Sequence, residues 1–316
     1  MRTRRGYLFL GQADEVHQVT PHYRAADLPV EGSRYGYRRR SPCRPLPQTH
    51  QLLSAVRLLA AFRAGSCQPP FQGRHLIPGG SEPLHFDREL RLLVLDAIER
   101  VEISVRTQWA YHFSHQYGPH GYLEHQHFKQ DRHGWHHGEQ LQRFAQEAAH
   151  SKEDFIVHLL RQYEEDLPPL WAAVEIMSLG HLSKWIANLK HGKDRNRIAR
   201  TYGMDETILV SFLHHLSIVR NLCAHHSRLW NREFTFTFRL PKRTPVPVAP
   251  VINWRAKRKL YNTLAMMTWF LDCICLEHHF RQRLTNLIGK HGIDTSAMGF
   301  PENWRELGFW NGTQDE

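Results

Sequence analysis

A run of apolar residues recurs at helical spacing within an otherwise polar part of this chain. The run begins at Phe86 and continues among aspartate, glutamate and arginine residues. It predicts an amphipathic helix from Asp87, as its N-cap, to about Gln116, where Gly118 and Pro119 end it. The apolar positions are Leu90, Leu93, Val94, Ala97, Ile98, Val101 and Val105.

The remainder of the chain after this helix is also mainly helical in pattern. We expect further helices over residues 139–165, 170–190, 194–202, 207–226 and 253–288. Only Phe234, Phe236 and Phe238, which alternate with two threonines, have the pattern of a strand. The sequence therefore predicts an all-α bundle over residues 85–316, with a small β excursion near residues 233–239.

Residues 1–84 have a different character. They contain 12 arginines, no lysine and five acidic residues, which accounts for seven of the ten net positive charges of the chain. Nine prolines interrupt them, and no helical or strand period is visible. We predict an irregular basic head, either disordered or read out of frame, so the net charge of the chain is not evidence for a nucleic-acid partner.

Cysteine usage and hydropathy indicate the compartment. Five cysteines lack paired spacing, which predicts free thiols and neither a disulfide framework nor a structural zinc module. No apolar run approaches the roughly 20 residues that cross a bilayer. We therefore expect a cytoplasmic protein without a membrane partner.

The best candidate for chemistry is the polar run from residue 220 to residue 232. Asn221 and His225 are four residues apart and share a helix face with Arg220 beside them, while Arg228 lies a turn further on. Histidine can move a proton near neutral pH and arginine can hold a phosphate, which together suit transesterification of RNA by its own 2′-hydroxyl. A helix C-terminus decorated with cations that complement its dipole explains the same residues about equally well.

Other polar clusters are weaker candidates. Glu99, Glu102 and Arg106 share a face of the first helix and can form a polar cluster beneath the motif, although a Glu102–Arg106 pair alone is usually structural. We interpret the basic residues between 190 and 200 mostly as a solvated face. Trp171, Trp185 and Trp269 fall on apolar faces and are assigned to the core.

Histidines 133, 136 and 137 cluster with Glu139 between two glycines. A metal site needs three or four converging ligands, and this interrupted string offers no helix to fix them. We predict a surface loop here and no metal site.

Four segments in order resemble one family, the Abi-like abortive-infection proteins of the AbiD/AbiF type. The run RNLCAHHSRLWNR at residues 220–232 is similar to the signature of that family. Residues 86–107 resemble its long helix, with an internal glutamate and a terminal Arg-Thr. Residues 167–189 resemble its Pro-x-Trp-x-x-x-Glu segment, and residues 299–304, with Trp310 after them, resemble its terminal Gly-Phe-Pro-x-x-Trp box.

The resemblance implies a fold and an activity. The family is similar to the HEPN superfamily of α-helical RNases, which carry an R-x4-6-H motif, dimerise through it and cleave RNA without metal or cofactor. Arg220, Asn221 and His225 would then be catalytic, with His226 as the alternative histidine. His226, Arg228 and Arg232 would contact RNA, and Glu102 and Arg106 would support the site.

By the same resemblance we expect a homodimeric phage-defence effector that acts on RNA. The alternative is a non-catalytic module that binds RNA or an antitoxin RNA.

The head departs from the family, which has a Tyr-Tyr-Arg-Leu-Ser-x-Tyr-Trp block there. Residues 50–63 (HQLLSAVRLLAAFR) can be encoded by codons that, read one base later, give TSYYRLSAYWLPF. We therefore interpret residues 1 to about 84 as an out-of-frame reading, with the family frame resuming at about His85. A divergent arm is the alternative.

Overall fold

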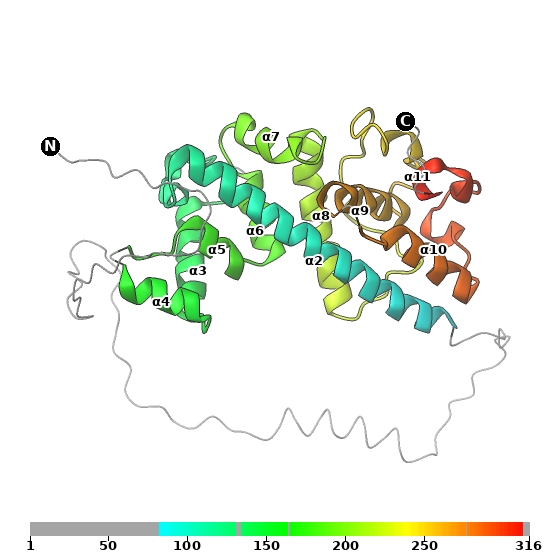
Figure 1. Ribbon diagram of the computed structural model, residues 1–316, viewed down its shortest axis with the longest axis horizontal. Helices are drawn as coiled ribbons and strands as arrows, with labels where there is room; N and C mark the ends of the chain where they lie inside the picture. Colours follow the sequence, from blue (N-terminus) through cyan, green and yellow to red (C-terminus); the bar gives the residue numbers. More distant parts are fainter. Residues whose placement is uncertain (1–81, 131–133, 164, 276, 312–316) are drawn as a thin grey trace, which may run out of the picture. The chain divides into compact units, whose positions relative to one another are not determined.

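The computed structural model describes residues 82–130, 134–163, 165–275 and 277–311 (Figure 1). The predictions made for residues 1–81 and for His133 lie outside these ranges. The described residues form ten α-helices and no β-strand, which confirms the all-α class. The helices are α2 (Glu82–Tyr117), α3 (His137–Ala149), α4 (Asp154–Gln162), α5 (Leu170–Ile176), α6 (Leu179–Ala187), α7 (Gly192–Arg200), α8 (Glu206–Ala224), α9 (Tyr261–Ile274), α10 (Phe280–His291) and α11 (Gly308–Asn311).

Helix α2 organises the fold. It is 36 residues long, which corresponds to about 54 Å, and it packs against α5, α6, α7, α8, α9 and α10 (Figure 1). Its apolar stripe is fully covered, with Val94, Val101 and Trp109 all inaccessible to solvent. The helix ends where predicted, at Gly118, whose φ of +82° suits a residue without a side chain. It begins at Glu82, however, so Asp87 lies inside the helix and is not its N-cap.

Three of the long predicted helices are each split into two. Residues 139–165 form α3 and α4, residues 170–190 form α5 and α6, and residues 253–288 form a turn followed by α9 and α10. The second split is explained locally, because the Ser178 hydroxyl accepts the backbone N–H of His181 at 3.2 Å and starts α6 with a cap. Apolar periodicity continues across such breaks, so periodicity alone did not reveal them.

The predicted strand at residues 233–239 is wrong. The rings of Phe234 and Phe238 are buried, and both pack against the imidazole of His215. The backbone of Phe234 pairs with Arg258, which belongs to a turn and not to a strand. The alternating aromatic residues therefore anchor an extended segment to α8 through their side chains, with no neighbouring strand among the described residues.

Helix α8 lies in the core and carries the candidate motif at its C-terminal end. Asp205 caps its first turn, because the Asp205 carboxylate accepts the backbone N–H of Thr207 at 2.8 Å. It is the one described helix long and apolar enough to cross a membrane by length and composition alone. Half of that apolar window is buried, and α8 packs against α6 and α2, as a core helix does.

One of the three tryptophans that we predicted to lie in the core is at the surface. Trp185 is fully buried, and Trp269 is partly buried with its indole N–H donating to the Tyr202 carbonyl at 2.8 Å. Trp171 is 44% exposed and therefore does not belong to the core. It lies on α5, at the edge of a surface groove described below.

Candidate functional site

The motif residues lie where α8 ends. His225 is the C-cap, and its backbone N–H donates to the Asn221 carbonyl at 2.9 Å. The next two amides turn back, His226 to Cys223 at 3.1 Å and Ser227 to Leu222 at 2.8 Å, which is the pattern of a Schellman motif. His226 occupies the left-handed position of this motif, with φ of +56°, where glycine is the usual residue.

The side chains of the motif face solvent. Arg220, Asn221 and His225 are all exposed, as are His226 and Arg228. Asn221 and His225 are one helical turn apart, as the spacing predicted. Burial raises the pKa of Cys223, between these residues, to about 12, so its thiol remains protonated and is no nucleophile.

A buried carboxylate holds the loop that follows α8. Oδ1 of Asp87 accepts the backbone N–H groups of Leu229 and Trp230, at 2.8 and 2.6 Å, while Oδ2 pairs with Arg91. Asp87 is only 4% exposed. Sequence reasoning missed this role, since an aspartate near a helix start is normally a cap. The signal available was that Asp87 lies within the apolar stripe, where an unpaired carboxylate is costly.

The polar cluster predicted beneath the motif is present in part. Nη2 of Arg106 lies 2.5 Å from Oε1 of Glu102 on the same helix. Burial is the main cause that raises the pKa of Glu102, and the positive charges of Arg106 and Arg220 act in the opposite direction. The structure thus brings the Arg220 charge of α8 within electrostatic range of Glu102 on α2.

Arg106 has a second, structural role. Its Nη2 also donates to the Met177 carbonyl at 2.8 Å, and its Nη1 lies 3.4 Å from Glu175. These contacts join α2 to the junction between α5 and α6. Arg106 therefore holds α2 against the junction of α5 and α6, while Glu102 is the member of this pair on which the Arg220 charge acts.

The outer cations of the motif occupy the loop after α8. Nε of Arg232 donates to the Arg228 carbonyl at 2.5 Å, which turns the Arg232 side chain back along the loop. Asn231 adopts a left-handed conformation, with φ of +49°, and its side-chain carbonyl accepts Nζ of Lys259 at 3.2 Å. The loop is thereby tied to the segment that precedes α9.

The surface loop predicted for the histidine cluster is wrong at His137 and Glu139, because both belong to α3 and His137 is half-buried. His137 stacks on Phe128 at 4.7 Å, and its Nε2 lies 2.9 Å from the Tyr122 carbonyl. Burial lowers the pKa of His137, which favours a neutral ring. Over the described ranges, no group of three or more histidine, cysteine, aspartate or glutamate residues could hold a metal ion.

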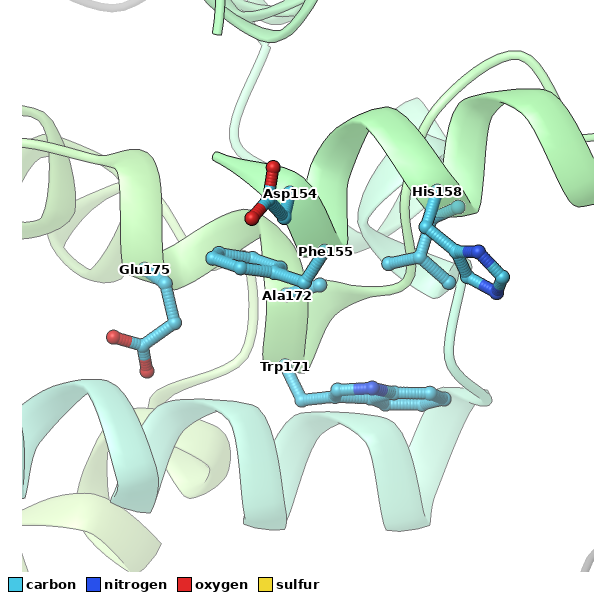
Figure 2. Close-up of a pocket in the computed structure, with 7 residues that line it drawn as sticks. Asp154, Phe155, His158, Trp171, Ala172 and Glu175 are labelled. Atoms are coloured by element: carbon cyan, nitrogen blue, oxygen red, sulfur yellow. The ribbon is translucent and has the colours of Figure 1, made fainter. Parts of the chain in front are cut away.

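One surface hollow of the described part lies away from the motif. It is a groove of about 610 Å³ between α4 and α5, and Figure 2 shows Phe155 and Trp171 pointing into it with Asp154 and Glu175 at its edges. Glu175 also reaches Arg106, so the groove and the polar cluster share one residue. The Trp and Glu of the Pro-x-Trp-x-x-x-Glu segment therefore line this groove.

The comparison with protein families agrees with the resemblance found in the sequence. Residues 81–231 match the family described as Abi-like protein, and this stretch includes α2 through the loop after α8. This part of the chain is therefore similar to the Abi-like protein family. No curated protein and no solved structure gave a match.

The family match covers every predicted site residue from Glu102 to the middle of the motif loop. It begins at residue 81, close to His85, where the sequence changes character. Arg232, the turn before α9 and the terminal Gly-Phe-Pro box lie beyond it.

Proposed function

We propose that this chain is an abortive-infection effector that cleaves RNA without metal, using Arg220, Asn221 and His225 at the end of α8. The observation that supports this most directly is the geometry of the motif. The end of α8, whose following loop is held by Asp87, presents an arginine, an amide and an imidazole to solvent. The charge of that arginine also acts on the half-buried carboxyl group of Glu102.

The proposed chemistry is transesterification by the RNA itself. His225 removes the proton from the 2′-hydroxyl or donates one to the leaving oxygen, and Arg220 neutralises the scissile phosphate. Asn221 orients the imidazole or a phosphate oxygen. Glu102 acts on Arg220 through its charge, and so positions the guanidinium without contacting RNA.

We propose that two copies associate through α8 to complete the site. The His225 imidazole has no hydrogen-bond partner among the described residues, whereas a proton-transfer group needs one to fix its orientation. A second motif placed against the first would supply such a partner. Cytoplasmic location and an RNA target belong to the same proposal.

The experiment compares cleavage and binding of single-stranded RNA by the purified chain and its variants. His225→Ala should lower the cleavage rate by about 10² or more while RNA remains bound. Arg220→Ala should weaken both binding and cleavage. His226→Gly tests the neighbouring histidine, because glycine suits the left-handed position and leaves the backbone of the motif intact.

The non-catalytic alternative is favoured by the exposure of Arg228 and His226, which could hold a structured antitoxin RNA without cutting it. It would replace the nuclease if the chain bound RNA tightly, no cleavage occurred at any protein concentration, and His225→Ala changed nothing. Loss of cleavage in His226→Gly with retention in His225→Ala would move the catalytic role to His226.

A further inference from the structure

A strongly basic turn lies just before α9. Residues 254–259, with the sequence Trp-Arg-Ala-Lys-Arg-Lys, contain four cations in six positions, and we call them the basic turn. Trp254 is 41% exposed, Arg255 and Lys257 are exposed, and Nζ of Lys257 lies 5.6 Å from the centre of the Trp254 ring. The turn thus presents an aromatic face and cations together.

The basic turn is bonded to the end of the motif loop. The Phe234 N–H donates to the Arg258 carbonyl at 2.9 Å, and Nε of Arg258 donates to the Phe234 carbonyl, also at 2.9 Å. Nζ of Lys259 donates to Asn231 at 3.2 Å. These three hydrogen bonds join residues 231–234 of the motif loop to Arg258 and Lys259 of the basic turn. The basic turn therefore borders the surface that carries Arg228 and Arg232.

The terminal Gly-Phe-Pro box packs against the basic turn through Gly299 and fixes its backbone. A Cβ atom at Gly299 would lie 2.6 Å from the Cβ of Lys259 and 2.8 Å from the Cβ of Ala256, so only glycine fits. Nδ2 of Asn253 donates to the Gly299 carbonyl at 2.9 Å, and Oδ1 of Asn253 accepts the Arg255 N–H at 3.0 Å. The turn therefore has a fixed backbone.

The charges on the basic turn are largely uncompensated. Lys259 lies 3.7 Å from Glu233, but neither Arg255 nor Lys257 forms an ion pair with a described carboxylate. By contrast, Arg195 pairs with Glu206. Unpaired cations that flank an exposed indole match a single-stranded nucleic acid, whose phosphates need cations and whose bases stack on aromatic rings.

We propose that the basic turn binds the backbone of single-stranded RNA and stacks a base on Trp254. The bound nucleotides are next to those that the motif at the end of α8 holds. This inference rests on the proposed function for the identity of the ligand. Its test is RNA binding, which does not require cleavage, so the failure of one is distinguishable from the failure of the other.

The test measures binding of a fluorescent oligouridylate of about 20 nucleotides to the full chain at several salt concentrations, using the His225→Ala background so that the probe survives. Removing both free cations, Arg255→Ala with Lys257→Ala, should weaken binding and make the slope of log K against log salt shallower by about 1.4. Trp254→Ala should weaken binding about tenfold with the salt slope unchanged.

The matched control is Lys152→Ala with Arg161→Ala, which removes the same charge from the exposed cations beside and on α4. The control should bind like the parent protein. Equal affinity and equal slope in the control and in the turn variant would overturn the inference. A second outcome would also overturn the inference: polyglutamate competes with RNA for the chain, and its binding is unchanged by Trp254→Ala. The turn would then recognise an acidic protein.

Cleavage of a short substrate distinguishes RNA binding by the basic turn from RNA cleavage at the motif. In the chain with His225 intact, cleavage of a dinucleotide too short to reach the turn should be unchanged by Arg255→Ala with Lys257→Ala. If the parent binds the long RNA through the turn but cuts neither substrate, the inference stands and the nuclease proposal fails.

Discussion

Asp87 is the single residue on which the shape of the motif loop most directly depends. Its carboxylate is nearly inaccessible and satisfies two loop amides as well as Arg91. Hydrogen bonds to a buried charged group contribute about 1.5–3 kcal/mol. Asp87→Asn should therefore lower the free energy of unfolding by about 2 kcal/mol, measured by urea denaturation.

The control for this substitution is Asp96→Asn. Asp96 pairs with Arg283 at 2.9 Å on the half-exposed side of α2, and such a pair contributes about 0–1 kcal/mol. Equal losses of stability in the two variants would show that Asp87 does not anchor the loop.

His215 makes stability depend on pH. Burial lowers the pKa of His215 to about 4, and its Nε2 lies 2.8 Å from the Thr263 hydroxyl. The Phe236 carbonyl can only accept, so Nδ1 carries the proton of the neutral ring. Between pH of about 6.5 and about 4 the unfolded chain binds a proton that the folded chain does not, so stability falls as the pH falls, by up to about 3 kcal/mol.

His215→Gln should remove this contribution from the dependence of unfolding free energy on pH. His158→Gln, at an exposed position on α4, is the control and should keep the dependence of the parent chain. A parent curve that stays flat from neutral pH to about 4 would contradict the account of His215.

At the scale of elements, the periodicity of the sequence predicted which segments are helical but not where helices break. Breaks such as the one before α6 depend on a capping hydroxyl at Ser178, which a pattern of apolar residues does not encode. The alternating phenylalanines at 234–238 suggested a strand, but the ring against which Phe234 and Phe238 pack is His215 on α8 and not a neighbouring strand. The spacing of Asn221 and His225 was predictable because both lie in the last turn and at the C-cap of one continuous helix.

Gly299 offers a test at this scale. Its φ is +85°, and a methyl group there would overlap the basic turn. Gly299→Ala should cost about 2 kcal/mol or more in unfolding free energy, from backbone strain and overpacking. Gly289→Ala, inside α10 with open space around the added carbon, should be neutral or stabilise by up to about 1 kcal/mol. Similar effects of the two substitutions would argue against close packing of Gly299 on the basic turn.

The site proposed at the end of α8 requires two copies of the whole chain to associate. The purified chain should sediment at twice its mass of 37.2 kDa, and RNA cleavage per mole of protein should fall on dilution as the dimer dissociates. Full activity from a monomer at every concentration would exclude a site shared between two copies.

The whole gene offers a second test, which concerns residues 1–84. If they are read out of frame, the DNA should encode the Tyr-Tyr-Arg-Leu-Ser block in the next frame, with a single insertion or deletion near the codon for His85. A stop codon in that alternative frame, or no such block, would remove the idea and leave a divergent basic arm.

The RNA ends that the purified chain produces in the presence of EDTA show whether it cleaves RNA by attack of the 2′-hydroxyl. Attack by the 2′-hydroxyl, assisted by His225, needs no metal and leaves a 2′,3′-cyclic phosphate, so we predict cyclic ends on cut RNA and no cutting of DNA. Cleavage abolished by EDTA, cyclic phosphate absent from the products, or DNA cut at a similar rate would contradict the proposal.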